Sequence, residues 1–277
     1  MGSATIDGLK IHYHTAGDLA APPGRRILYV HGTGCDGRVW ARHMAALADR
    51  HAAVAIDLPG HGRSEGDGFR GVADYAYCVA RLAAHLGWDR CVVAGHSLGG
   101  GIALALAVYH AELLDGLLLI DTGARLRVDP VILENARRAV EGEPPLALDP
   151  RMGYAKSTPQ SVIDEIEALT ADTDPRVTYK DWISDDSFDF MSRVSGIQVP
   201  SLAICGDEDR FTPVKYHVYL RDRMPNCQLA IITRAGHWTY AEQPQTFDRV
   251  VRSYLDTLPS QRLEERGRLS HRQKETG

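Results

Sequence analysis

A serine framed by glycines offers the clearest chemistry in this sequence. The segment Gly95-His96-Ser97-Leu98-Gly99 matches the pattern G-x-S-x-G, directly after an apolar run that predicts a strand and directly before a pattern that predicts a helix. In such an elbow the glycines permit a tight turn, which lifts the serine hydroxyl out of the sheet near the positive end of the helix. Ser97 is therefore predicted to be a nucleophile. The alternative is that the glycines only pack the helix against the strand.

The elements that must position this serine alternate between short apolar runs and longer helical patterns. This alternation predicts an α/β fold with a mainly parallel sheet and crossover helices, and the Asp7-Gly8 turn predicts an antiparallel hairpin at its start. Strands are predicted at 4–6, 9–14, 26–31, 52–57, 91–96, 116–121, 201–205 and 228–233, and helices at 39–49, 75–86, 98–110, 214–224 and 246–258.

One interval, 123–195, breaks this alternation, because it carries helical patterns and no strand signal. Short helices are predicted at 133–140 and 188–194. Thr158 is predicted to cap a further helix whose first position is Pro159, since threonine favours the N-cap and proline favours the first turn.

These patterns divide the chain into a core domain, 1–122 and 196–258, and a helical cap, 123–195. We interpret the cap as a lid over a functional site; the alternative is an insertion without a role. The strongly polar segment 259–277 predicts a solvated C-terminal tail.

The elbow in its strand–helix context resembles the α/β-hydrolase superfamily, and the resemblance covers about Ile6 to Leu258. It implies a mostly parallel eight-stranded sheet flanked by helices, with the cap inserted, and a triad in the chain order nucleophile, acid, base. The segment DLPGHGRS at 57–64 is a second hallmark of the superfamily. We interpret it as a structural turn beside the site.

The resemblance also implies the two partners of the nucleophile. A serine hydroxyl needs a base that a third group holds in place. His237 follows the last predicted strand and is the expected base. The pattern G-x-x-D-x-x-x-P at 206–213 assigns the acid to Asp209, with Asp121 as a rival because some members place the acid there.

An oxyanion that develops during acyl transfer needs aligned N–H donors. One donor is expected to be the backbone amide of Leu98, at the start of the elbow helix. By resemblance, the second comes from the loop HGTGCDG at 31–37, where Thr33 is expected to donate and Gly34 is the alternative.

Residue identity narrows the reaction. Dehalogenases and epoxide hydrolases of this superfamily carry Asp where this chain has Ser97, which argues against both activities. No His/Cys/Asp cluster has metal-ligand spacing, and no G-x-G-x-x-G follows the first parallel strand, so neither a metal nor another cofactor is expected. Hydrolysis through an acyl-serine remains.

The expected substrate is a small-molecule carboxylic ester, lactone or thioester of modest acyl size, because the loop at 31–37 resembles small esterases and enol-lactonases. Two alternatives stay open. Trp238 after the predicted base resembles carbon–carbon hydrolases that act on aromatic ring-fission products, and the loop also resembles receptor-like hydrolases that sense small molecules. The residues expected to bind substrate are Trp238, Phe188, Met191 and Trp40, with Tyr154, Trp182 and Phe190 as further apolar candidates.

Bulk properties limit the partners. A net charge of −5 over 277 residues gives no basic surface for nucleic acid. The N-terminus lacks a signal-peptide pattern, and the longest apolar run is too short to span a bilayer, so no membrane partner is expected. Five cysteines without a C-x-x-C pair favour a reducing, cytoplasmic setting. A monomer and a homodimer are both compatible with the sequence.

Overall fold

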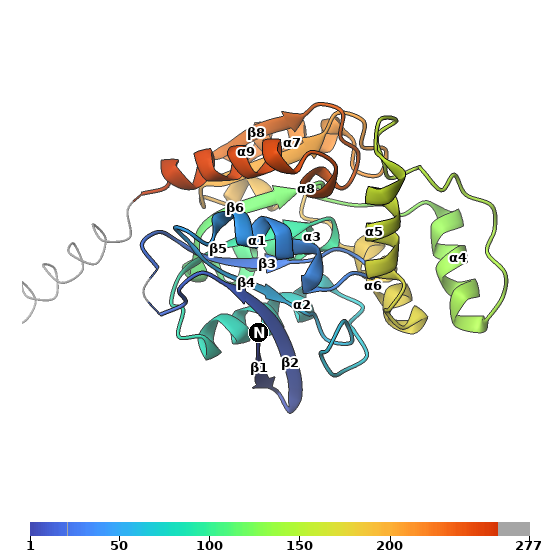
Figure 1. Cartoon of the computed structure of the whole chain (residues 1–277), viewed down its shortest axis with the longest axis horizontal. Helices are drawn as coiled ribbons and strands as arrows, with labels where there is room; N and C mark the ends of the chain where they lie inside the picture. Colours follow the sequence, from blue (N-terminus) through green and yellow to red (C-terminus); the bar gives the residue numbers. More distant parts are fainter. Residues whose placement is uncertain (21, 260–277) are drawn as a thin grey trace, which may run out of the picture.

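The computed structural model describes residues 1–20 and 22–259 (Figure 1). Eight strands form one sheet in the order β1-β2-β4-β3-β5-β6-β7-β8. Their bounds are β1 Gly2–Ile6, β2 Leu9–Ala16, β3 Arg26–Val30, β4 Ala52–Ile56, β5 Cys91–His96, β6 Leu114–Ile120, β7 Ser201–Gly206 and β8 Cys227–Ile232.

The sheet is antiparallel only at its N-terminal edge. β1 pairs with β2 and β2 with β4 in antiparallel fashion, and all remaining neighbours are parallel. Asp7 and Gly8 both adopt positive φ, at 48° and 86°, as the turn of the predicted hairpin requires. The predicted mostly parallel eight-stranded sheet is therefore confirmed.

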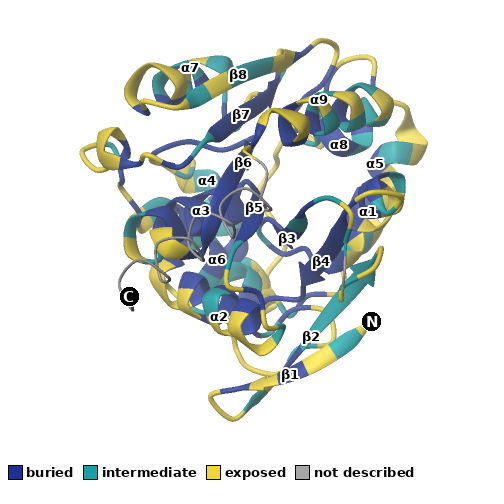
Figure 2. Cartoon of the chain, turned by 90° about the vertical axis from the view of Figure 1, so that its left-hand side faces the viewer, coloured by how far each residue is buried: buried dark blue, intermediate teal, exposed yellow. Residues whose placement is uncertain are grey.

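Helices cover both faces of the sheet. The core helices are α1 Ala41–Leu47, α2 Val72–His85, α3 Leu98–Tyr109, α7 Val214–Arg223, α8 Thr239–Glu242 and α9 Pro244–Thr257, with short 3₁₀ turns η1 Gly37–Trp40 and η2 Ala111–Leu113. Leu28 and Val30 of β3 belong to the apolar cluster that contains α2 and α3, whereas Ile27 and Tyr29 belong to the cluster that contains α1 and α9. Successive side chains of this strand thus fill two cores, as in a sheet buried on both faces. Figure 2 shows β4, β5, β6 and β7 coloured as buried, with exposed residues on the helices around them.

The chain between β6 and β7 carries helices and no strand. It holds α4 Pro130–Glu141, α5 Gln160–Thr170, α6 Pro175–Ser187 and the 3₁₀ turn η3 Val194–Gly196. We call 121–200 the inserted segment. In Figure 1, α4, α5 and α6 lie together at one end of the molecule, beyond the sheet.

Two local predictions within the inserted segment are wrong. No helix forms over 188–194: Asp189 instead makes an isolated antiparallel bridge with Arg125. Thr158 does not cap α5, because Pro159 takes the N-cap position and the Thr158 hydroxyl donates to Glu242. The sequence also failed to predict α6.

No helix within the described residues is long and apolar enough to cross a membrane. The predicted polar tail, 259–277, lies outside the described residues except for Pro259.

Candidate active site

Ser97 occupies a strained turn between β5 and α3. Its φ of 53° and ψ of −116° lie outside the regions that residues with a side chain normally adopt. The turn depends on its glycines, since a Cβ on Gly95 would lie 2.0 Å from the Gly99 carbonyl oxygen, and one on Gly99 would lie 2.3 Å from the Val30 carbonyl oxygen. Ser97 Oγ makes no hydrogen bond to another described residue, so its side chain can rotate without breaking one.

His237 and Asp209 meet beyond the ends of β8 and β7. His237 Nδ1 donates to Asp209 Oδ2 at 2.9 Å, and both side chains are buried. Asp209 also accepts from the backbone N–H groups of Phe211 and Thr212, at 2.8 and 2.9 Å, and from the Thr212 hydroxyl at 2.6 Å. Burial opposes ionisation of Asp209, but the imidazole and these donors outweigh it and hold the carboxyl pKa below its ordinary value.

Asp121, the rival acid, occupies a different place. Its carboxylate accepts from the Gly206 amide and from the amide and hydroxyl of Thr239, at 3.2, 3.2 and 2.7 Å. It makes no hydrogen bond to His237. Asp121 therefore ties the loops after β7 and β8 together, while Asp209 contacts the imidazole.

The two amides expected to hold an oxyanion have no hydrogen-bond acceptor within the described part of the chain: these are Thr33 N and Leu98 N. Gly34 N, the alternative donor, is already used, because it donates to Asp181 Oδ2 at 3.0 Å. The geometry therefore leaves Thr33 and Leu98 available and Gly34 occupied.

A cavity of about 660 Å³ lies between the core and the inserted segment. The core contributes Thr33, Ser97, His237 and Trp238 to its lining. The inserted segment contributes Ile132 from α4, Thr170 from α5 and Thr178, Trp182 and Asp185 from α6. This volume suits a small molecule.

Of the four residues predicted to bind substrate, Trp238 lines this cavity and the other three lie elsewhere. Trp40 is fully buried against Tyr29 and Tyr240, with ring centroids 5.1 and 4.6 Å apart. Phe188 packs over Gly101, where a Cβ would lie 2.7 Å from the ring. Met191 packs against the core cluster that contains α2 and α3. These three apolar side chains therefore pack in or against cores and are not part of the cavity lining.

Helix α6 places Trp182, one of the further apolar candidates, in the cavity lining, together with Thr178 and Asp185, which the sequence did not indicate. Its buried face is largely polar, with Asp181, Ser184 and Asp185 beside Val177, so no apolar stripe marks it. A usable signal was Asp174-Pro175: Asp174 accepts from the Arg176 amide at 2.8 Å, as an N-cap residue does.

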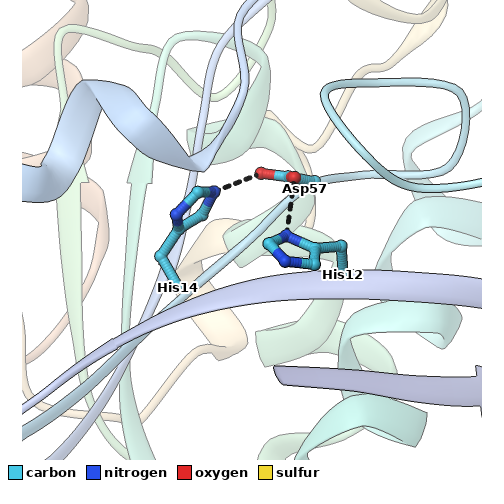
Figure 3. A group of neighbouring side chains, drawn as sticks. All are labelled: His12, His14 and Asp57. Atoms are coloured by element: carbon cyan, nitrogen blue, oxygen red, sulfur yellow. Dashed lines mark hydrogen bonds and ion pairs between the residues drawn. The ribbon is translucent and has the colours of Figure 1, made fainter. Parts of the chain in front are cut away.

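A second histidine–carboxylate group lies on the hairpin side of the sheet. Asp57, at the start of the 57–64 turn, accepts from His12 Nδ1 at 3.1 Å and His14 Nε2 at 3.0 Å (Figure 3). The amides of Gly37 and Arg63 also donate to it, at 2.9 and 3.1 Å. Each carboxylate oxygen therefore accepts two hydrogen bonds, and Asp57 anchors two loops to β2. This cluster of metal-ligand residue types leaves no spacing signal in the sequence, because its members lie far apart in the chain.

Comparison with known proteins agrees with the fold. Residues 27–250 match the model of the alpha/beta hydrolase family, and the chain belongs to that family. It is 31% identical to a thermophilic esterase of known structure, with a TM-score of 0.78 over 92% of this chain and 96% of the other.

Two further proteins widen the range of chemistry among similar folds. A 2-hydroxy-6-oxononadienedioate/2-hydroxy-6-oxononatrienedioate hydrolase from Burkholderia vietnamiensis is 27% identical over 89% of this chain and 91% of its own. The enol-lactonase of Burkholderia xenovorans LB400 shares the fold with a TM-score of 0.83 at 22% identity, over 92% of this chain and all of the other. The chain is thus a hydrolase by family.

Proposed function

We propose that this hydrolase cleaves a carboxylic ester, lactone or thioester of modest acyl size through an acyl-serine intermediate. The observation that carries the proposal is the strained Ser97 elbow, which opens into the same cavity as a histidine held by Asp209. The thermophilic esterase at 31% identity supports the ester class.

The proposed reaction has two steps. Because Asp209 accepts the Nδ1 proton of His237, the Nε2 atom is the basic nitrogen. Rotation of Ser97 brings its hydroxyl to Nε2, which takes the proton as Oγ attacks the carbonyl carbon. The protonated imidazole then gives that proton to the leaving alcohol. In the second step Nε2 takes a proton from a water molecule as the water oxygen attacks the acyl carbon. The imidazole then gives this proton to Ser97 Oγ, and the carboxylic acid leaves.

The free amides of Thr33 and Leu98 stabilise the negative oxygen in both steps. We propose that the inserted segment is a cap, since α4, α5 and α6 all contribute to the cavity and so face the substrate. Trp182 and Trp238 are the proposed apolar contacts.

The test is steady-state hydrolysis of p-nitrophenyl acetate and butyrate by the wild type and Ser97→Ala. We expect turnover by the wild type, loss of about a thousandfold or more in the variant, and labelling of Ser97 by a fluorophosphonate probe. Equal activity of the two proteins would overturn the proposal. Release of one equivalent without turnover would favour a small-molecule sensor.

A second candidate function is hydrolysis of a carbon–carbon bond in a ring-fission product, which the Burkholderia vietnamiensis relative supports. Arg127 and Lys215 at the cavity provide cations for a substrate carboxylate. Turnover of such a dienoate at a higher kcat/KM than any p-nitrophenyl ester would favour this candidate.

A further inference from the structure

Asp185 of α6 brings a buried carboxyl group to the cavity. The residue is 1% exposed and belongs to the lining that also holds Ser97 and His237. Its Oδ2 accepts a hydrogen bond from Thr33 Oγ1 at 2.7 Å, while Oδ1 has no partner. A buried polar atom without a partner is costly, and a bound ligand that supplies the missing hydrogen bond removes that cost.

Asp181, one helical turn before Asp185, is a buried carboxylate whose two oxygens both have hydrogen-bond partners. It accepts from His61 Nε2, from the Tyr75 hydroxyl and from the Gly34 amide, at 2.8, 2.7 and 3.0 Å. His61 and Tyr75 thus both bind Asp181, and no described cation makes a salt bridge with Asp185.

This environment favours the neutral acid at Asp185. Burial raises its pKa to about 8; the hydrogen bond from Thr33 opposes the shift, and the charges of Asp181 and Asp186 add to it. Since Oδ2 already accepts from Thr33, the carboxyl proton belongs on Oδ1, the atom without a partner.

We propose that Asp185 donates a hydrogen bond from Oδ1 to an acceptor oxygen of the substrate, and so selects esters whose acyl chain carries a second oxygen, such as a ketone. The inference rests on the proposed function, because it assigns a substrate class to the same cavity. Asp185 would be a specificity residue beside Thr33, with no part in the bond-breaking steps.

The experiment compares two substrates of one shape. In p-nitrophenyl levulinate a ketone oxygen stands where p-nitrophenyl isocaproate has a methyl group. The readout is the ratio of their kcat/KM values, because a ratio compared between variants cancels the intrinsic reactivity of each ester. The proteins are the wild type, Asp185→Leu, Asp185→Asn and the control Glu165→Gln, an exposed acid of α5.

We expect the preference for the levulinate to fall about tenfold in Asp185→Leu, which has no donor. It should stay within about twofold in Asp185→Asn, whose amide accepts from Thr33 and still donates, and be unchanged in Glu165→Gln. In the wild type the preference should decline between about pH 7 and about pH 9, as Asp185 loses its proton, whereas Asp185→Asn should show no such decline.

An unchanged preference in Asp185→Leu, with Ser97→Ala inactive, would overturn this inference and leave the proposed function standing. Activity in Ser97→Ala would instead remove the proposed function. A wild-type preference for a cationic ester, lost in Asp185→Leu, would also overturn the inference, because it would show an ionised Asp185. If Asp185→Leu does not fold, the pH profiles of the wild type and Asp185→Asn decide the question.

Discussion

The two sides of the cavity are built in different ways. On the core side, Ser97, Asp209 and His237 follow the ends of β5, β7 and β8, where backbone contacts leave little freedom. On the other side, α6 presents Asp185, which accepts a single hydrogen bond, from Thr33. A rigid sheet edge can thus keep the reacting atoms in place while the inserted segment varies the recognition of substrate.

The two sides also differ in the environment of a buried aspartate, Asp209 in the core and Asp185 in α6. Asp209 receives an imidazole, a hydroxyl and two amides, and its pKa is lowered. Asp185 receives one hydroxyl, and burial raises its pKa to about 8. The imidazole and the three further donors thus favour the anion at Asp209, whereas burial favours the neutral acid at Asp185.

The largest expected effect is on the core side. Asp209→Asn should lower kcat/KM for p-nitrophenyl butyrate by about a thousandfold or more, since an amide no longer holds His237 in the tautomer with a basic Nε2. The control is Asp207→Asn, an exposed neighbour that accepts one bond from the Arg234 amide, and it should keep near wild-type activity. Equal losses in the two variants would show that the acid is assigned wrongly.

The elbow should also not tolerate an added side chain at Gly95. Gly95→Ala places a Cβ 2.0 Å from the Gly99 carbonyl oxygen, so we expect the free energy of unfolding to fall by about 3 kcal/mol or more. Urea unfolding measures the change. Gly196→Ala is the matched control in the inserted segment, because nothing lies within 4 Å of the added Cβ. A folded Gly95→Ala protein with wild-type stability would contradict the strained turn.

The contrast between the two sides also explains what the sequence could predict. The strands alternate with helices in a regular pattern, and the elbow, His237 and Asp209 lie at loop positions that the motif specifies, so the sheet and the pairing of His237 with Asp209 could be anticipated. Helix α6 could not, because its buried face is polar. The sequence also could not predict whether Trp40 and Phe188 pack in a core or line the cavity, because an aromatic side chain has the same sequence pattern in both places.

The pH dependence of stability tests the neutral state of Asp185. Between about pH 4 and about pH 8 the folded state holds this proton while the unfolded chain has released it, so the group lowers stability as pH rises. Relative to the wild type, Asp185→Asn should therefore gain free energy of unfolding over this range, by up to about 1.4 kcal/mol for each pH unit. Urea titrations at several pH values measure the difference. A constant difference between the two proteins would show that Asp185 is ionised throughout.

The smallest expected effect on stability and activity is that of Glu242, which links the loop of His237 to the inserted segment. Glu242, buried in α8, accepts from the amides of Gly236 and Trp238, which flank His237, at 2.9 and 3.1 Å. Its other oxygen accepts from the Ala155 amide at 2.8 Å and from the Thr158 hydroxyl. In Glu242→Gln an NH₂ group replaces one of the two accepting oxygens. This group is a donor that faces other donors, so their hydrogen bonds are lost. We expect a loss of about 1–2 kcal/mol in stability.

Glu242→Gln should also lower kcat/KM, because the amides on both sides of His237 lose a good acceptor. This loss should be smaller than that in Asp209→Asn. The matched control is Glu208→Gln, which also links the core to the inserted segment but accepts only one bond, from the Lys156 amide at 3.0 Å in an exposed place. Thermal melts and ester kinetics on both variants measure the effect. Equal and small changes in the two would show that the loop of His237 holds its position without the inserted segment, and the two sides of the cavity would then be independent.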